Sequence, residues 1–190
     1  MTGRIRVGAW LPFRAEERVD GRSFVWRARV GPLEVVDRFA AGSGSTRGRL
    51  LGRLPLFAAD DPDTARSAAG RAALEAIWTP ASLRPQHGVT WRAEADDLIV
   101  AGWDVPPERP QVHMRIRTDG GLVSAWAQRW GNPDRTGFRY VACGCEVHAE
   151  QRFGALVVPS RITVGWHFGT PDYSPFFAAE LHELRPAANY

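Results

Sequence analysis

The sequence predicts a mainly β protein, in which an antiparallel, strongly curved sheet or half-open β-barrel is crossed by one helix and encloses a hydrophobic pocket. Three observations predict this fold. Apolar and polar residues alternate along most of the chain, as they do in strands. Helical spacing is confined to one segment, and no alternation of strands and helices predicts a parallel sheet. About ten strands are too many for a flat sheet, so we expect the sheet to curl.

The amino-terminal third reads as strands joined by glycine-containing turns. Alternation runs from Ile5 to Ala15 and predicts one long strand with a kink or edge position at Pro12, because proline cannot donate to a strand ladder. Residues 24–39 follow as a hairpin around a Gly-Pro turn, and residues 40–57 supply a Gly/Ser turn and another strand pair.

The one predicted helix covers residues 60–78. Asp61 can cap it, Pro62 suits the first helical position, and alanines then recur at helical spacing. A stripe of alanines lets a helix lie close against a sheet, and Arg71 and Glu75, four residues apart, can pair on its flank. The prolines that follow stop the helix.

After the helix, the chain is almost entirely strands separated by turn residues. The 190 residues suffice for one core, so we expect a single domain over residues 1–190. The predicted strands cover residues 89–95, 98–105, 111–118, 121–130, 137–153, 155–168 and 176–184.

Composition excludes several classes of chemistry. All 24 residues counted as Lys plus Arg are arginine, which excludes a lysine Schiff base, pyridoxal phosphate attachment and a P-loop lysine. The net charge is +3, but the arginines are spread along the chain near acids, so we expect no nucleic-acid partner. No apolar run approaches the roughly 18 residues of a membrane helix, and the amino terminus lacks the apolar core of a signal peptide. We therefore expect a cytoplasmic protein with no membrane partner.

The two cysteines predict neither a disulfide nor a metal site. Cys143 and Cys145 alternate on one predicted strand, where a bridge between them would be strained, and His148 lies on its other face. We expect buried, reduced thiols. Motifs for a serine nucleophile elbow, a zinc protease helix, a dinucleotide loop or paired C-x-x-C are missing, so we expect no cofactor and no metal.

A set of local strings adds a resemblance to this interpretation. In order along the chain they are SAAGRAALEAIWTPASL, GVTW, RWGNPDRTG, FGALVVPS and GWHFGT. Together they resemble a bacterial domain-of-unknown-function family with the motifs SAAGRxxxExxWxPxxL, RWGxP, FGGxxxP and GWHxGT. The resemblance implies a fold like the half-open barrel of lipoprotein and lipid carriers. Two departures stand out: a segment that usually precedes GRIRVG is missing, and VACGCEV replaces a string like HPFGGEV at residues 141–147.

An acid stands where the alternation of residues 24–39 calls for an apolar side chain. Leu33, Val35 and Phe39 share a face with Asp37, and a carboxylate on a buried face is costly unless it is paired. Asp37 is therefore either one partner of a structural ion pair or a proton donor or acceptor.

We add two further residues to the candidate catalytic group. Arg129 shares a face with Ala125 and Ala127, although periodicity alone cannot decide whether that face or the opposite one points inward. His167 lies next to the inward Trp166, so simple alternation turns it away from the pocket, where it would bond to backbone. The candidate catalytic residues are Asp37, Arg129 and His167.

Aromatic and small side chains are candidates for contact with a ligand. Flat apolar surfaces bind hydrophobic molecules, although each of these side chains can equally be packed in the core. The candidates for substrate binding are Trp26, Trp126, Trp130, Tyr140, Cys143, Cys145 and Trp166.

Two functions fit this pattern. The first is a cofactor-independent enzyme, a cyclase, isomerase or lyase of secondary-metabolite type, that holds a hydrophobic small molecule while an acid moves a proton. The second is a non-catalytic binding or carrier protein for lipid-like ligands. An unpaired carboxylate beside the pocket would favour the enzyme, and a purely apolar pocket would favour the carrier. The substrate and the oligomeric state stay open.

Overall fold

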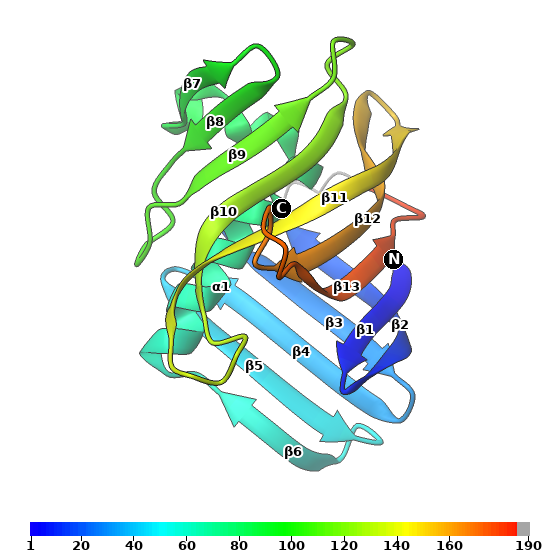
Figure 1. Ribbon diagram of the computed structural model, residues 1–190. Coiled ribbons are helices and arrows are strands. Elements are labelled where there is room, and N and C mark those ends of the chain that lie inside the picture. The colour runs from blue at the N-terminus through cyan, green and yellow to red at the C-terminus, as the bar shows by residue number, and fades with distance from the viewer. Residues whose placement is uncertain (186–190) are drawn as a thin grey trace.

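A computed structural model describes residues 1–185 as a mainly β structure with a single antiparallel sheet (Figure 1). The sheet has 13 strands in the order β6, β5, β4, β3, β2, β1, β13, β12, β11, β10, β9, β8, β7. The strands are β1 Thr2–Val7, β2 Ala9–Val19, β3 Phe24–Val30, β4 Leu33–Ala40, β5 Ser43–Leu50, β6 Leu54–Ala59, β7 Thr90–Ala95, β8 Leu98–Gly102, β9 Gln111–Ile116, β10 Leu122–Gly131, β11 Arg139–Phe153, β12 Leu156–Trp166 and β13 Ser174–Glu180.

The first and last strands meet in the middle of the sheet. β1 pairs antiparallel with β13, with Thr2 opposite Glu180 and Ile5 opposite Phe177. This pairing joins one half, β1 to β6, to the other half, β7 to β13. The edge strands are β6 and β7, each next to the connection that carries the helix.

The predicted long strand over residues 5–15 is wrong, because the chain reverses at Gly8. Gly8 has φ +73°, which suits glycine, and Val7 pairs directly with Ala9 across the turn. Ile5 therefore lies opposite Leu11 on one face, so the alternation of apolar residues continues in phase through the reversal. Pro12 lies opposite Arg4 in β2.

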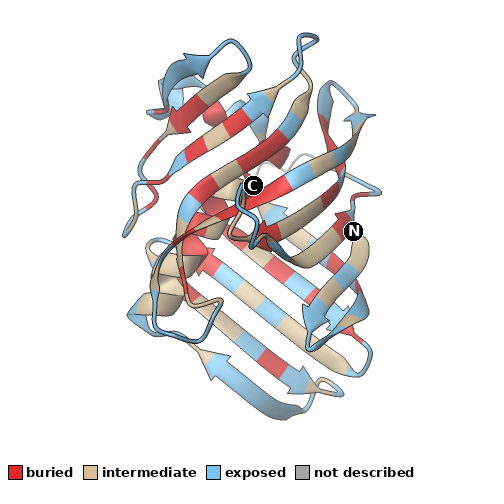
Figure 2. Cartoon of the chain, viewed as in Figure 1, coloured by how far each residue is buried: buried red, intermediate tan, exposed pale blue. Residues whose placement is uncertain are grey.

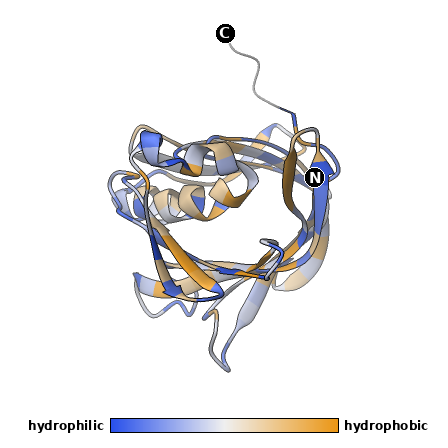
Figure 3. Cartoon of the chain, turned by 90° about the horizontal axis from the view of Figure 1, so that it is seen from above, coloured by the Kyte–Doolittle hydropathy of each residue, from blue (hydrophilic) through white to orange (hydrophobic). Residues whose placement is uncertain are grey.

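The single α-helix, α1 Pro62–Leu74, lies against both halves of the sheet, as the view from above shows (Figure 3). Its backbone begins as predicted: the Asp61 carboxylate accepts a hydrogen bond of 2.8 Å from the Thr64 amide. The helix ends four residues before Trp78, and the short 3₁₀ helices η1 Glu75–Trp78, η2 Pro80–Leu83 and η3 Pro85–His87 follow.

Small residues allow the helix to approach the sheet. The face of α1 that includes Ala68, Ala69, Ala72 and Ala73 is buried. On β5, a Cβ added to Gly44 would lie 2.8 Å from the helix backbone at Ala65. The alanine stripe thus places α1 against the inner face, by which we mean the sheet face turned toward the helix.

Burial alternates along the strands and separates the inner face from the outer face (Figure 2). On β3, Phe24 and Trp26 are buried while Arg27 and Arg29 are exposed. On β10, where alternation left both faces open, Ala125 and Ala127 are fully buried. A bulge between Leu122 and Ser124 shifts the start of that strand.

Candidate functional site

An apolar cavity of about 290 Å³ lies between the carboxyl end of α1 and the inner face of the sheet. Both halves of the sheet contribute to its wall, together with η1. Most of the wall is aliphatic or aromatic, and the apolar lining residues are Ile5, Trp26, Val35, Leu74, Ile77, Trp78, Ile162, Val164, Phe176 and Phe177.

Three carboxylates enter this wall around one guanidinium. Arg71 of α1 lies 2.8 Å from Glu17 on β2, 2.5 Å from Asp37 on β4 and 2.5 Å from Glu75 in η1. Asp37 also accepts a hydrogen bond of 2.6 Å from the Thr46 hydroxyl on β5. The acid on the apolar face of β4 is therefore ion-paired, and its partner comes from the helix.

Three carboxylates surround one guanidinium in this cluster, and burial shifts the pKa values of its glutamates. Burial, and then the charge of Glu75, raise the pKa of Glu17 well above its ordinary value. Burial likewise raises the pKa of Glu75, against the attraction of Arg71. Burial alone would lower the pKa of Arg71, but Glu75, Glu17 and Asp37 outweigh it and raise that pKa. Glu17 and Glu75 therefore keep their protons to a higher pH than exposed glutamates do.

Two buried polar atoms in residues that line the cavity lack a hydrogen-bond partner within residues 1–185. They are Oε2 of Glu75, a residue 8% exposed, and Nε1 of Trp26, a residue 4% exposed. Buried polar atoms are rarely left unsatisfied, because each costs roughly 1–3 kcal/mol. Both atoms are thus unsatisfied and buried, in residues that line one cavity.

A second guanidinium, that of Arg129 on β10, also lines the cavity. Its Nε donates 2.9 Å to the Ser67 carbonyl of α1, and its centre lies 5.1 Å from the ring of Trp166. A Cβ added to Gly70 of α1 would come within 2.8 Å of the Arg129 side chain, so this glycine makes room for it. Among the described residues, no carboxylate lies within ion-pair distance of Arg129.

The structure brings four of the predicted site residues to the cavity: Asp37, Arg129, Trp26 and Cys145. Cys143 is buried behind the wall, with Sγ 3.9 Å from the Arg129 guanidinium. Burial raises the pKa of both thiols, to about 12 for Cys145, so they are held as neutral thiols.

The remaining predicted residues lie outside the cavity. His167, at φ +56°, places Nε2 3.0 Å from the Asp134 carboxylate. Trp126 stacks between His113 and Phe168. Trp130 donates to Asp63 and lies under the Arg66 guanidinium, whereas the half-exposed Tyr140 donates to Glu108. Trp166 contacts the cavity indirectly, through Arg129.

Sequence reasoning missed Glu17 and the full role of the helical pair. Glu17 shows the same signal as Asp37, since it follows Phe13 and Ala15 at inward positions of β2. Arg71 and Glu75 do pair, but in a buried position next to the cavity and not on an exposed flank.

Within residues 1–185, no group of His, Cys, Asp and Glu is arranged to hold a metal ion. None of the helices described there is long and apolar enough to span a bilayer.

Comparison with known proteins gives one match. A model described as a family of unknown function (DUF6920) matches residues 1–185. Searches of curated proteins and of solved structures return no significant match.

Proposed function

The chain belongs to the family of unknown function DUF6920, and from its own residues we propose a cofactor-independent enzyme that acts on a hydrophobic small molecule. In this proposal, the two halves of the sheet curve around α1 as a half-open barrel and enclose the cavity. The reaction belongs to the cyclase, isomerase or lyase type, in which a proton moves and no electrons are exchanged with a cofactor.

The cluster of three carboxylates around Arg71, set in an otherwise mostly apolar cavity wall, carries the proposal. Glu75 lines the cavity, and burial in these largely apolar surroundings raises its pKa as well as that of Glu17. A carboxylate there is desolvated, and removal of water strengthens it as a base toward a C–H group of a bound molecule. Glu75 is thus the group that we assign to proton transfer.

The neighbouring residues then take supporting roles. Arg71 holds Glu17, Asp37 and Glu75 together and compensates part of their charge. We assign the Trp26 indole N–H, which has no partner among residues 1–185, to donate to a substrate oxygen on which negative charge develops. Arg129 supplies a positive charge for an anionic end of the substrate.

A general probe of such a base is 5-nitrobenzisoxazole. Removal of its C–H proton by a carboxylate breaks the N–O bond and releases 2-cyano-4-nitrophenolate, which is coloured, without any co-reactant. We expect the protein to accelerate this elimination over free acetate. Glu75→Gln should lower the rate by about 100-fold, in the range of general base catalysis.

The matched control is Glu16→Gln, which removes the same charge from the outer face of β2 and should keep the full rate. A folded Glu75→Gln protein that retains the rate of the unmodified protein would show that this carboxylate is not the base.

A carrier of lipid-like ligands is the second candidate, and the predominance of apolar lining residues favours it. Its signature is displacement of the dye 1-anilinonaphthalene-8-sulfonate by hydrophobic competitors, with equal affinity in Glu75→Gln and no accelerated elimination. The same two proteins thus separate the enzyme from the carrier.

A further inference from the structure

The inner face of β4, β5 and β6 continues beyond the cavity as an apolar surface. Val35 on β4 lines the cavity, and Leu33 lies two residues away on the same face of that strand. Leu33 lies opposite Leu50 on β5, and Leu50 lies opposite Leu54 on β6. A row of leucines thus leads from the cavity wall to the edge of the sheet.

Phe57 on β6 lies beside this row. It belongs to the same face, since it lies opposite Gly48 and Gly48 lies opposite Val35. A Cβ added to Gly48 would come within 2.1 Å of the Phe57 ring, so the ring lies across this glycine. Leu54 is 58% exposed and Phe57 is 44% exposed. We call Leu33, Leu50, Leu54 and Phe57 the apolar strip.

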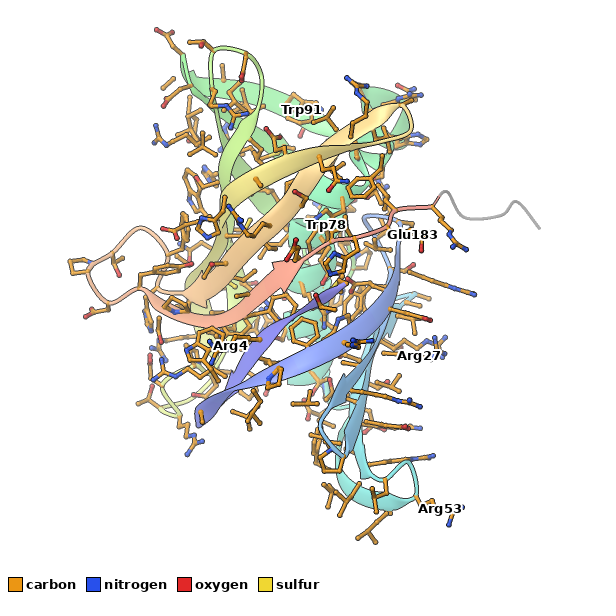
Figure 4. The ribbon with its side chains drawn as sticks, turned by 90° about the vertical axis from the view of Figure 1, so that its right-hand side faces the viewer. Arg4, Arg27, Arg53, Trp78, Trp91 and Glu183 are labelled. Atoms are coloured by element: carbon orange, nitrogen blue, oxygen red, sulfur yellow. The ribbon has the colours of Figure 1, made fainter. Side chains whose placement is uncertain are left out.

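The outer face of the same strands has the opposite character. Arg29 lies opposite Glu34, and Glu34 lies opposite Arg49. Arg27, which shares this face, is seen extending outward in Figure 4. The exposed apolar strip is therefore on the side of the helix and the cavity, and charged side chains cover the other side.

On the inner face, charge is confined to the cavity. Asp37 follows Val35 on the inner face of β4 and is paired with Arg71. On the other half of the sheet, the half-buried Arg129 lines the cavity and has no carboxylate within ion-pair distance among residues 1–185. A guanidinium without a counter-ion, in a cavity that continues into an apolar surface, suits a molecule with one anionic end and one long apolar end.

The size of the strip argues against a protein partner. A stable protein interface buries roughly 800 Å² on each side and uses about 20–30 residues. The apolar strip has only four side chains, and the cavity from which it continues can admit a flexible chain but not a folded surface. A small amphiphilic molecule fits both parts.

We propose that the cavity takes a long-chain aliphatic carboxylic acid, with its carboxylate on Arg129 and its chain passing Val35 and lying along the apolar strip. The path from Val35 through Leu33 to Leu54 measures roughly 16 Å, since residues of a strand advance by about 3.4 Å and neighbouring strands are about 4.8 Å apart. Carbon–carbon bonds of about 1.5 Å advance an extended chain by about 1.3 Å each, so about a dozen methylenes cover this path. The inference rests on the proposed function, because it takes the same cavity as the substrate site.

Displacement of the fluorescent long-chain acid cis-parinarate tests the proposal, with the affinity of the probe itself measured for each variant. The competitors are palmitate, which is long enough to lie along the strip, and octanoate, which is too short. Leu33→Asn/Leu54→Asn should weaken palmitate binding by more than about tenfold, because it removes apolar contact with the chain. It should weaken octanoate binding by less than about twofold, which also shows that the variant is folded.

Two further variants separate the chain from the carboxylate. Val36→Asn is the matched control for the strip, because Val36 is 38% exposed on the outer face of β4, and it should leave the affinity for both acids unchanged. Arg129→Gln should weaken palmitate binding by more than about tenfold but leave binding of the uncharged palmityl alcohol within about twofold.

The proposal is overturned if Leu33→Asn/Leu54→Asn weakens both acids equally, if Val36→Asn weakens palmitate binding as much, or if Arg129→Gln leaves palmitate binding unchanged. These results are separate from those of the proposed function, which is tested by elimination of 5-nitrobenzisoxazole. Palmitate binding with this pattern but without elimination would support the inference and overturn the enzyme. Elimination without palmitate binding would do the reverse.

Discussion

At the scale of single residues, the informative feature is an acid on a strand face that is otherwise apolar. Asp37 and Glu17 both interrupt period-2 alternation, and the sequence alone shows that each needs a partner. The sequence did not predict that both acids share Arg71 as their partner. Arg71 lies far from them in the sequence, on a helix, where its spacing predicts a pair with Glu75. A pattern can thus locate a buried charge, whereas its compensation depends on tertiary packing.

The raised pKa of Glu17 gives stability a definite pH dependence. The unfolded glutamate releases its proton near pH 4.5, and the folded one releases it at higher pH. Between these values the folded state binds the extra proton, so this residue makes the protein less stable as pH rises through that window. We expect Glu17→Gln to raise the free energy of unfolding at pH 8 by more than about 1 kcal/mol relative to its effect at pH 5. Urea unfolding at both pH values measures this difference.

Glu16→Gln is the control for that measurement, since Glu16 is the exposed neighbour of Glu17. Its effect should be the same at both pH values. If Glu17→Gln instead destabilised the protein more at pH 8 than at pH 5, Glu17 would be held as a carboxylate by Arg71.

At the scale of elements, the helix was predictable and the first hairpin was not. Asp61, Pro62 and the alanine stripe mark α1 by local chemistry. The turn at Gly8 was not predicted, because Val7 pairs directly with Ala9 across it. Odd-numbered residues therefore stay on one face before and after the turn, and the alternation gives no sign that the chain reverses. The inward face of β10 was undecided for a related reason: both of its faces carry apolar residues.

The distance between α1 and β5 depends on Gly44. A Cβ at this position would lie 2.8 Å from Ala65 Cα and 2.9 Å from Ala68 Cβ, so the helix would have to move. We expect Gly44→Ala to lower the free energy of unfolding by about 1–3 kcal/mol, as overpacking does. Thermal unfolding measures this loss.

Gly102→Ala on β8 is the matched substitution, because its added Cβ would have no neighbour closer than 3.4 Å. It should cost less than Gly44→Ala. Equal losses in the two proteins would mean that close contact with the helix is not what requires glycine at position 44.

At the scale of the whole molecule, the sequence predicted an antiparallel, mainly β structure with one helix, and the structure confirms this. The order of the strands in the sheet could not be predicted from the sequence, since β1 pairs with β13, which is far from it in the chain. The clustering of charged residues on one face could not be predicted from the sequence either. Arginines that look dispersed along the sequence lie together in the folded sheet, because successive hairpins return every second residue to one face.

The open sheet predicts a gradient of backbone protection. β6 and β7 are its edges, and their residues are exposed apart from Ala59, which is half-buried. We expect their amides to exchange with deuterium fastest among the strands, and those of β11 and β12 to exchange slowest. Hydrogen–deuterium exchange with mass spectrometry measures this order. Protection of β6 equal to that of β4 would mean that another chain covers the edge.

The central position of β1 and β13 also has a consequence for synthesis. Of the thirteen strands described, β1 is translated first, and β13, the neighbour that completes its hydrogen bonds, is translated last. Without β13, β1 has no strand on its other side, and the strands from β1 to β6 lack the connection to the other half. The two halves can therefore become one sheet only after translation has passed residue 180.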